Sequence, residues 1–436
     1  MRTANIPTRT WSGRHRWCPQ HLLAPRDEAG VLEGLALARS RKLPLRVIGG
    51  GHSFTPLAAT DGVAMSLEAL SGLVRADPAS GLVTLRGGTR LWEIAELLAP
   101  YGLALSVMGD IDRQSIAGAI QTGTHGTGAR FTGFAGMVRA LRLALADGNI
   151  VETSPTQDPD LFQAARLGLG TIGIVLEVTI ACVPAYRLDL VESTEPLEAT
   201  VGSFLPDSAI TDHHEFFWFP RTDRATVRVS RRVPQETARR RPSRAAELLQ
   251  QEVLGNGAWE LLCRSAALVP HLSRPAAEIA SRVFAGPRVV DESAAVFTAP
   301  RRVRFQESEW AIPASRFPAA FAALRARFED ENVRVTFPLE VRRAAADDVW
   351  LSTAHGRDTV YIAAHRYHRE EAGPYLLMVQ RVLEPFAARP HWGKRHWLGR
   401  KELTSLYPRF EDFRTVREAV DPDGVLLTGY LRHLLL

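Results

Sequence analysis

Two glycine-rich segments near the start of the chain constrain its fold more than any other feature. Residues 49–51 are three successive glycines directly after the apolar run LPLRVI, and residues 109–128 hold five glycines among small and polar side chains. Glycine has no Cβ, so its backbone can take a positive φ and come close to a ligand. Successive N–H groups can then form a concave nest around phosphate oxygens. Two such loops in one region favour one long phosphorylated ligand held between them.

The spacing of the first loop argues against a Rossmann dinucleotide-binding turn. A GxGxxG fingerprint starting at Gly49 requires glycine at position 54, where the chain has Phe54. A third stretch, GLGTIG at 168–173, either passes close to a flat group or only turns the chain. Each loop alone is compatible with an ordinary glycine turn, so the prediction of a cofactor depends on the set.

The elements around these loops predict an α+β fold. Apolar spacing favours a helix over 28–41. Branched or alternating runs indicate strands at 43–48, 63–67 and 81–88. Residues 91–102 form a further predicted helix with Gly102 as its stop, and 137–154 form a predicted hairpin that turns at DGN. Helices and strands alternate too irregularly, up to a long strand that ends at Pro184, for a repeating βαβ array.

The texture of the sequence changes after Pro184. We interpret residues 186–360 as a second domain with its own sheet, a helical block near 244–284 and a strand over VRVTFPLEVR (333–342). The arginine-rich stretch 231–244 is broken by prolines and contains no aromatic residue. This composition argues against a nucleic-acid site, and it favours a solvated loop.

Composition bounds the class of protein. A chain of 436 residues is long enough for two or three domains, and its 45% hydrophobic and 23% charged residues are typical of a globular protein. No apolar run reaches the roughly 18 residues that span a bilayer, and no apolar segment follows the charged N-terminus, so we expect a cytoplasmic protein. Cys18, Cys182 and Cys263 are far apart, which predicts neither a disulfide nor a metal site.

The ordered set of motifs resembles a known family. RVIGGGHSF, TDGV, GDIDRQSIAGAIQTGTHGTG, DGNIVE and LGLGTIGIVLEVTI follow one another as in the FAD domain of the vanillyl-alcohol-oxidase superfamily, whose FAD-binding domain is of the PCMH type. FPLEVR and RPHWGK narrow the resemblance to the aldonolactone and alditol oxidase branch, closest to its L-gulono-1,4-lactone oxidases and dehydrogenases. The match covers nearly the whole chain except the region around 190–260.

The resemblance implies a domain order. An FAD-binding domain would span 15–184, in two subdomains of about 15–75 and 76–184. A cap, or substrate, domain over 185–360 would be α+β with an antiparallel sheet. Residues 361–436 would complete the cap and return to the FAD site.

The resemblance also implies which residues bind FAD. One side of the cofactor would be wrapped by the first loop, through Val47, Gly49, Gly50, Gly51 and Ser53. The other side would be lined by the second loop, through Ser115, Gly118, Thr122, Gly123 and His125. Ile174 would lie near the adenine end.

His52 matches the histidine that many members of the superfamily bond to the flavin 8α-methyl carbon. A neutral imidazole nitrogen can add to the electrophilic quinone-methide form of the flavin, while the cofactor still carries the redox chemistry. The alternative is a loop histidine that only hydrogen-bonds a phosphate or a carbonyl group. The resemblance favours covalent FAD, and some relatives hold the cofactor without this bond.

Glu340 and Arg342 are the first candidates for catalysis. They are two residues apart on a predicted strand, so both side chains point to the same face. The carboxylate could accept from substrate hydroxyls, and the guanidinium could stabilise negative charge on the substrate oxygen or the reduced flavin. Without the resemblance, a surface ion pair would be the simpler interpretation.

Lys394, in HWGK, is carried over from the resemblance as a residue near both the flavin and the reacting hydroxyl. A lysine in a confined site can have a lowered pKa and take part in proton transfer. The alternative is an ordinary exposed lysine between two tryptophans. His391 and His365 are weaker candidates, for which a structural role is an equally good interpretation.

Gly109 and Asp110 stand just before the second loop. In the superfamily a small residue at the position of Gly109 permits dioxygen to reach the flavin, so we expect oxidase behaviour with hydrogen peroxide as product. A dehydrogenase that uses another acceptor stays open. Asp110 departs from the serine or alanine of several relatives, and in the pocket its charge would shift substrate choice.

These observations predict FAD-dependent oxidation of an aldono-1,4-lactone, of L-gulono-1,4-lactone type, by hydride transfer to flavin N5. The alternatives are an alditol oxidase, an NADPH-dependent flavoprotein reductase, and a sugar-binding protein with a degenerate site. The predicted partners are a sugar lactone or polyol and O2 or another electron acceptor, without nucleic acid or a membrane span. The sequence leaves the sugar, the acceptor and the oligomeric state open.

Overall fold

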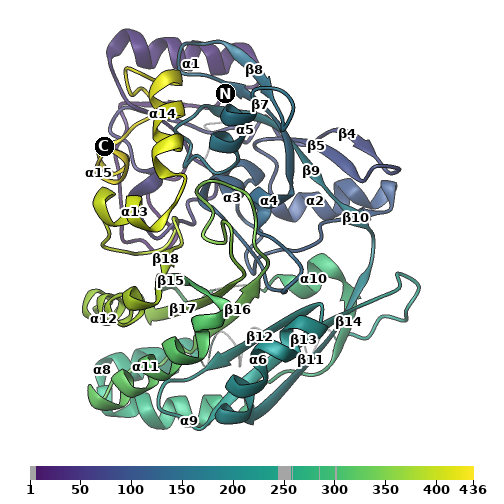
Figure 1. The fold of residues 1–436 in the computed structure, drawn as a ribbon, viewed down its shortest axis with the longest axis vertical. Coiled ribbons are helices and arrows are strands. Elements are labelled where there is room, and N and C mark those ends of the chain that lie inside the picture. The colour runs from purple at the N-terminus through teal and green to yellow at the C-terminus, as the bar shows by residue number, and fades with distance from the viewer. Residues whose placement is uncertain (1–5, 244–256, 258, 284, 300–301) are drawn as a thin grey trace.

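The computed structural model describes residues 6–243, 257, 259–283, 285–299 and 302–436. Its named strands form four sheets of three, five, eight and two strands. Figure 1 shows the N-terminal elements in one half of the molecule and the eight-stranded sheet in the other. The predicted α+β class with an antiparallel sheet in the second half of the chain is confirmed.

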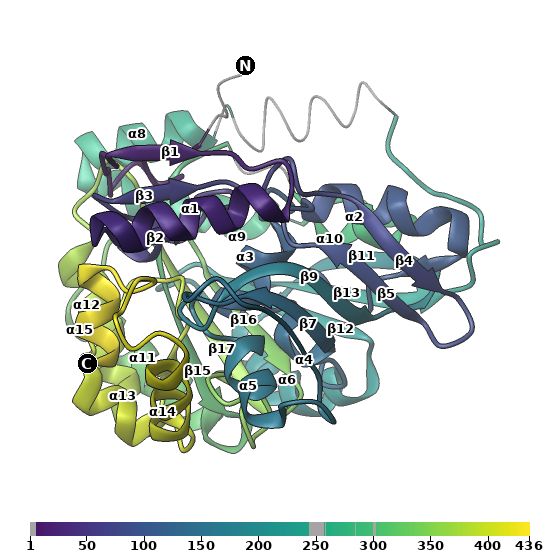
Figure 2. The same cartoon turned by 90° about the horizontal axis from the view of Figure 1, so that it is seen from above.

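The first sheet is small and parallel, in the order β1-β3-β2. Its strands are β1 (His21–Leu23), β2 (Leu45–Val47) and β3 (Val63–Met65). Helix α1 (Glu28–Arg41) begins at Asp27, whose carboxylate accepts from the N–H of Gly30 at 2.9 Å. The helix buries Val31 and Leu35 in the same cluster as the strand residues, and it lies along β2 and β3 in Figure 2.

The second sheet is antiparallel, in the order β4-β5-β9-β7-β8. Its strands are β4 (Leu73–Asp77), β5 (Leu82–Arg86), β7 (Val138–Ala144), β8 (Ile150–Thr153) and β9 (Ile174–Ala181). The helices between them are α2 (Leu91–Leu98), α3 (Ile116–Thr122), α4 (Phe134–Met137) and α5 (Pro159–Arg166). Gly102, at φ +64, ends the 3-10 turn (Ala99–Tyr101) that extends α2, and Gly148, at φ +96, turns the β7–β8 hairpin, as predicted.

The eight-stranded sheet is antiparallel throughout, in the order β14-β11-β13-β12-β16-β17-β15-β18. Its strands are β11 (Arg187–Pro196), β12 (His213–Trp218), β13 (Arg224–Val233), β14 (Val289–Glu292), β15 (Phe305–Pro313), β16 (Leu339–Ala344), β17 (Thr359–Tyr367) and β18 (Arg389–Pro390). A two-stranded sheet of β6 (Leu103–Ala104) and β10 (Val183–Pro184) lies where the chain passes from one half to the other.

Helices cover one face of the large sheet. The helices on this face are α6 (Leu197–Ile210), α11 (Phe317–Asp330) and α12 (Gly373–Leu383). The other helices of this half are α8 (Trp259–Leu268), α9 (Ser273–Val283) and α10 (Ser293–Phe297), and they lie toward the opposite face, where Cys263 packs in the cluster of Phe305, and Phe297 packs on His213. Buried aromatic rings fill the space between the sheet and α6 and α11, with Phe216 and Trp218 against Phe321. Because this face is apolar, the charged residues of the same strands lie on the other face, toward the N-terminal half.

Two predictions for the second half of the chain need correction, and a third can be compared with the structure only in part. The strand predicted over 333–342 starts only at Leu339, because Pro338 has no N–H for a ladder and its carbonyl instead contacts Nδ1 of His365 at 3.1 Å. The helical block is described as α8 and α9, and the rest of it lies outside the described residues.

The prediction of a solvated loop over 231–244 is wrong at its start, whereas residues 234–243 are irregular and mostly exposed. Strand β13 continues to Val233, and the guanidinium of Arg232 lies over the rings of Phe131 and Tyr186 at 4.4 and 4.2 Å. Arg239 and Arg241 pair with Asp291. These two arginines are paired because the chain returns to the acidic end of β14, which is a long-range contact.

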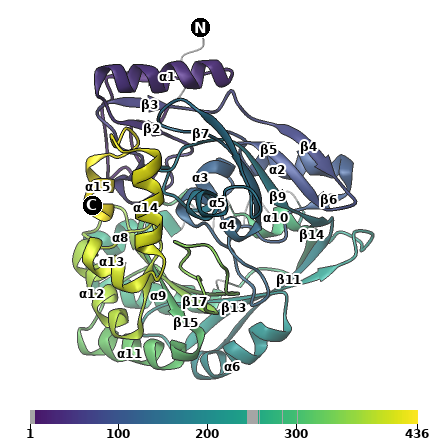
Figure 3. The same cartoon turned by 45° about the horizontal axis from the view of Figure 1, so that its top comes forward.

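The C-terminal segment returns to the N-terminal half. In Figure 3, α14 (Phe410–Val420) and α15 (Gly429–Leu435) lie near β2, and α13 (Arg400–Leu406) lies nearer to α12. The N–H of Leu45 donates to the carbonyl of Val425 at 2.8 Å, and Leu426 belongs to the same buried cluster. The end of the chain therefore stabilises the strand that leads into the first glycine loop.

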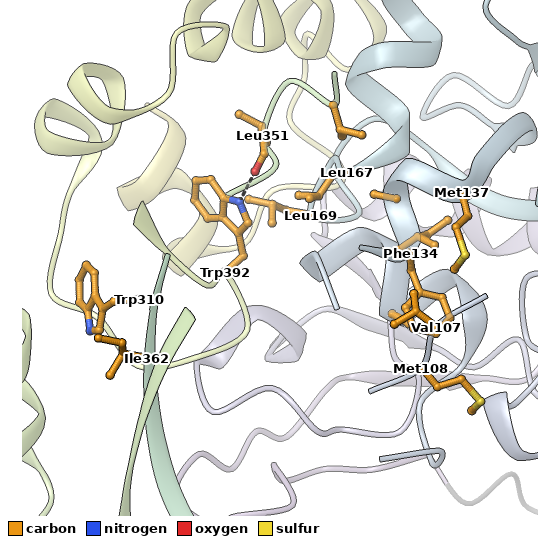
Figure 4. Packing of buried hydrophobic residues seen from close by; sticks show 14 of the residues in the cluster. Val107, Met108, Phe134, Met137, Leu167, Leu169, Trp310, Leu351, Ile362 and Trp392 are labelled. Carbon is orange, nitrogen blue, oxygen red and sulfur yellow. Dashed lines mark hydrogen bonds between the residues drawn. The ribbon is translucent and has the colours of Figure 1, made fainter. Parts of the chain in front are cut away.

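One buried cluster runs through both halves. Figure 4 shows Phe134 and Met137 on one side and Trp310 and Trp392 on the other. The indole N–H of Trp392 donates to the carbonyl of Leu351 at 2.7 Å. No helix in the described ranges is both long and apolar enough to cross a membrane.

Candidate active site

Two neighbouring cavities lie at the glycine loops, the first within the N-terminal half and the second between the two halves. The first encloses about 990 Å³, including its open part, and is lined mainly by the glycine loops and by residues 169–175. The second encloses about 690 Å³ and is lined by the charged face of the large sheet. Both are lined by His52, Ser53, Gln114 and Thr122. They therefore meet at the end of the first loop.

The two predicted loops pack directly against each other. Gly51 has φ +68, a conformation that favours glycine. A Cβ on Gly50 would lie 2.5 Å from the carbonyl oxygen of Arg113, and one on Gly49 would lie 2.6 Å from Oγ of Ser115. These contacts explain why the first loop needs successive glycines: any side chain would push the second loop away.

The predicted FAD residues fall into three groups. Most of them line the first cavity: Val47, Gly49, Gly50, Gly51, His52, Ser53, Ser115, Gly118, Thr122 and Ile174. Gly109, Asp110, His125 and Lys394 line only the second cavity. Gly123 lines neither; it ends α3 at φ +77, and a Cβ there would lie 3.1 Å from Leu167.

Sequence reasoning missed part of the first cavity. Gly87 and Gly88 line it, and a Cβ on Gly87 would collide with the carbonyl of Val175. The signal was present, because the pair ends the strand predicted over 81–88. Arg46, which donates to the carbonyls of Leu169 and Gly170 at 2.8 and 3.0 Å, had no local signal because its partners are far along the chain.

His52 is neutral and has a free ring nitrogen. Burial, followed by the charge of Lys394 and two arginines, lowers its pKa to about 4. Trp11 stacks beside the imidazole, with ring centroids 5.9 Å apart. Among the described residues, Nδ1 of His52 has no hydrogen-bond partner although it is buried. A neutral imidazole with an unused lone pair is the state that can act as a nucleophile.

The floor of the second cavity is a set of charged side chains on alternate strand positions. Glu307 and Glu309 are two apart on β15, and Glu340 and Arg342 are two apart on β16. The strand between them, β17, places the small Ala363 opposite both Glu309 and Glu340. The antiparallel register thus gathers charges that are more than thirty residues apart in the sequence.

Arg342 is the centre of a buried charge cluster. It contacts Asp110 and Glu340, and its Nε donates to Glu215 at 3.1 Å. Burial favours the neutral form, but the three carboxylates outweigh it and raise the pKa of Arg342 well above its usual range. Glu340 and Arg342 are only 4% and 7% exposed, so the alternative of a surface ion pair is wrong.

Lys394 is held by Glu307. Its Nζ lies 2.5 Å from the carboxylate, with 20% of the lysine side chain and 5% of the glutamate side chain exposed. Burial alone would lower the pKa of Lys394, but Glu307 and then Glu309 outweigh it, and the pKa is raised. The expectation of a lowered pKa is therefore wrong, as is the alternative of an ordinary exposed lysine.

The histidines around this floor have defined partners. Nε2 of His125 lies 3.2 Å from Glu309, its Nδ1 lies 2.9 Å from the carbonyl of Gly126, and its ring stacks on Tyr361 at 3.5 Å. Nε2 of His365 lies 3.6 Å from Glu307. Neither Tyr361 nor Glu309 had a recognisable motif in the sequence.

A metal site at His125, Glu309 and His391 does not fit their hydrogen bonds. The ligand atoms of these three residues lie within 4.8 Å of one another. However, Nδ1 of His391 accepts from the N–H of Gly393 at 3.0 Å, which leaves the proton of the neutral ring on Nε2. Burial lowers the pKa of His391 to about 3, so the ring is neutral. Nδ1 then already accepts a hydrogen bond and Nε2 carries the proton, so neither nitrogen offers a free lone pair to a metal.

The segment 389–395 connects the large sheet to the first loop. The N–H groups of His391 and Arg395 donate to the carbonyls of Glu309 and Glu307 at 3.0 and 2.9 Å. On its other side, Gly393 accepts from the N–H of Phe54 at 2.6 Å. The resemblance implied that the tail returns to this region, and the geometry brings Lys394 to within 5.1 Å of the Phe54 ring centre.

Comparison with known proteins agrees with this arrangement. Residues 19–154 match the FAD binding domain family. Residues 178–434 match the D-arabinono-1,4-lactone oxidase family. The chain belongs to this family. The predicted FAD cofactor, the oxidoreductase class and the aldonolactone branch of the superfamily are thereby confirmed.

Several curated relatives of this D-arabinono-1,4-lactone oxidase family protein are similar over nearly their full length. It is 35% identical to L-gulono-1,4-lactone dehydrogenase of Mycobacterium tuberculosis, over 98% of each chain. It is 32% identical to L-gulonolactone oxidase of Scyliorhinus torazame, over 97% of this chain and 96% of the relative. It is 31% identical to alditol oxidase of a Streptomyces species, over 88% and 89%.

A solved structure supports the fold. Cholesterol oxidase from B. sterolicum superposes with a TM-score of 0.77 at 15% identity, covering 100% of this chain and 99% of the other. At that identity the likeness concerns the fold of this D-arabinono-1,4-lactone oxidase family chain and not its substrate.

Proposed function

We propose that the protein oxidises an aldono-1,4-lactone of L-gulono-1,4-lactone type with FAD as cofactor. The observation that carries the proposal is the meeting of two cavities at His52, one lined by glycine loops and one by buried charges. The family and the gulonolactone relatives support the substrate class. The predicted division at 15–184, 185–360 and 361–436 and a cytoplasmic location remain part of the proposal.

The glycine loops would hold the FAD diphosphate through backbone N–H groups. This role fits Val47, Gly49, Gly50, Gly51 and Ser53, which line the first cavity where a Cβ on Gly49 or Gly50 would collide with the second loop. Ser115, Gly118 and Thr122 of the second loop line the same cavity, and Ile174 would lie near the adenine end. Gly123 would act indirectly, by ending α3.

His52 would carry the covalent link to the cofactor. Its neutral ring, the unpartnered Nδ1 and its place where both cavities meet support this role. Acid precipitation of the protein should leave the flavin on the pellet, and His52→Ala should release it. Flavin released from the unaltered protein would overturn the link, while FAD binding by the loops would stand.

The charged floor would bind the sugar and stabilise charge on its reacting oxygen. Bound FAD supplies the chemistry of accepting the hydride from the substrate carbon. Arg342 and Lys394 keep their protons, so they would serve as fixed positive charges near the substrate oxygen. Glu340 is then the member of the predicted trio that can accept the hydroxyl proton.

Gly109 and Asp110 would set acceptor and substrate preference. Gly109 lines the second cavity, and a Cβ there would lie 3.2 Å from the carbonyl of His125, so the position is tight. Its small size favours O2 as acceptor, with hydrogen peroxide as product. Asp110 pairs with Arg342, so it does not add an unpaired negative charge to the cavity. It would instead reduce the positive potential that Arg342 presents to the substrate.

An alditol oxidase is the second candidate function. The 31% identity to the Streptomyces alditol oxidase supports it. The buried carboxylates could accept from the hydroxyls of an open-chain polyol as well as from those of a lactone.

One experiment separates these functions. The yellow protein is mixed anaerobically with L-gulono-1,4-lactone, L-galactono-1,4-lactone, xylitol and NADPH in turn, and then exposed to air. We expect bleaching of the flavin by a lactone and rapid return of the colour in air. Bleaching by xylitol alone supports the alditol oxidase, and bleaching by NADPH alone overturns the proposal. Colour that stays bleached in air indicates a dehydrogenase.

A further inference from the structure

Glu307 has no role in the function proposed so far, yet it makes the closest polar contact of Lys394. Its Oε2 lies 2.5 Å from the ammonium nitrogen, and its Oε1 lies 3.6 Å from Nε2 of His365. The carboxylate is buried, with 5% of its side chain exposed. An ionised carboxylate in such a place requires cations around it, and Lys394 supplies one.

The backbone fixes this pair as firmly as the side chains do. Arg395 donates its N–H to the carbonyl of Glu307 at 2.9 Å, so the chain just after Lys394 is anchored on β15. On the opposite face of the same strand, Gln306 accepts from Arg395 Nη1 at 2.7 Å. Glu307 points into the second cavity, and Gln306 points away from it.

We propose that Glu307 is a positioning residue that holds Lys394 as a fixed ammonium group facing the second cavity, so that Lys394 acts as a source of positive charge and not as a base. The inference rests on the proposed function for the role of Lys394, but its test needs no sugar. Glu307 belongs to the charged floor, but in this account it acts on the reaction through Lys394 and not on the reacting atoms.

Other titratable or charged groups face Lys394, and their titrations have to be distinguished from that of Lys394. They are Glu309 on the same strand, Glu340 and Arg342 on β16, His365 on β17, His391 in the tail, His125 after α3 and His52 in the first loop. The pKa values of His52 and His391 are lowered by burial to about 4 and about 3, so neither ring titrates at alkaline pH. A new alkaline transition that disappears when Lys394 is replaced by Met therefore reports Lys394.

The first test follows the flavin absorbance spectrum of the holoenzyme with pH. A carboxylate within about 4–6 Å favours the charged form of a lysine by roughly one to three pH units. The folded protein raises the pKa of Lys394, so its charge is present at neutral pH and is lost only as pH rises through that value. Glu307→Gln should bring the transition down by about one to three pH units.

Matched variants show whether the effect comes from the charge. Glu307→Asp keeps the carboxylate and should keep the transition as in the unaltered protein. Gln306→Ala removes a tail contact on the opposite face of β15 and should also leave it unchanged. Lys394→Met should abolish the transition in combination with Glu307→Gln. If Glu307→Gln does not retain flavin, the role of Glu307 is tested with the other variants. Glu307→Asp and Gln306→Ala should then titrate like the unaltered protein, and both should differ from Lys394→Met.

The second test uses sulfite, an anion that bleaches flavins and is favoured by nearby positive charge. Glu307→Gln should weaken sulfite binding about tenfold above the new transition, and Lys394→Met should weaken it at every pH. The inference would be overturned if Glu307→Gln changed neither the pH of the alkaline transition nor sulfite binding. It would also be overturned if Gln306→Ala shifted the transition by the same amount as Glu307→Gln. Failure of every sugar to bleach the flavin, with these shifts present, would overturn only the proposed function.

Discussion

The two cavities bind their contents by different means. The first is built from backbone and glycine, with loops so close that a Cβ on Gly49 or Gly50 would meet the neighbouring loop within 2.6 Å. The second is built from charged side chains that reach one face of a sheet from several strands. A glycine loop is local in the sequence, whereas the charged floor exists only after the strands are ordered. The two regions should therefore fail in different ways when they are altered.

The largest effect is expected at the centre of the charged floor. Arg342→Met leaves Asp110, Glu340 and Glu215 without their shared cation, and breaking a buried pair of this kind costs about 3–5 kcal/mol. The free energy of unfolding should fall by about that amount, measured by denaturant titration. Arg343→Gln, the next residue, whose side chain points to the opposite face, is the control. Equal losses in both variants would contradict a specific role of the floor.

A smaller effect is expected at the glycine loops. Gly50→Ala would place a Cβ about 2.5 Å from the carbonyl of Arg113 and force the loops apart, at a cost of about 1–3 kcal/mol. The ratio of flavin to protein absorbance should fall, while the remaining fold stays intact by circular dichroism. Gly202→Ala, in α6 with open space around it, should keep full flavin content. Normal flavin content in Gly50→Ala would show that the loops do not need this close approach.

The smallest effect is expected between the two regions, at Gly109. Gly109→Ala brings a Cβ to 3.2 Å from the carbonyl of His125, which narrows the second cavity without removing a charge. Reoxidation of the bleached flavin by O2 should slow about tenfold, equivalent to roughly 1.4 kcal/mol. Anaerobic bleaching should change much less. Stopped-flow absorbance measures both steps, and equal slowing of both would show that Gly109 does not control access of O2.

The same contrast explains what the sequence could predict. The loops, the turn at Gly148 and the stop at Gly102 are coded by local residue choice, and the structure has them where predicted. Glu340 and Arg342 could be placed on one face because strand side chains alternate. None of these predictions required knowledge of which strands are neighbours.

The predictions that failed depended on distant partners. The pKa of Lys394 is raised because of Glu307, which is 87 residues earlier and carries no motif. Arg232 was expected in a solvated loop, but it stacks on Tyr186 and Phe131. Glu309 and Glu340 lie on either side of Ala363, because β17 is placed between β15 and β16 in the sheet. Strand order is a property of the whole fold and leaves no short-range signal.

The central claim is that the charged floor, and not the glycine loops, carries the alcohol chemistry. Its most direct test is the rate of anaerobic flavin bleaching by L-gulono-1,4-lactone in Glu340→Gln, measured by stopped flow at saturating lactone. We expect a loss of about 10²–10⁴ in this rate, the usual contribution of a positioned base, with flavin content equal to that of the unaltered protein. An unchanged rate, or a loss of rate that only follows loss of flavin, would contradict the account.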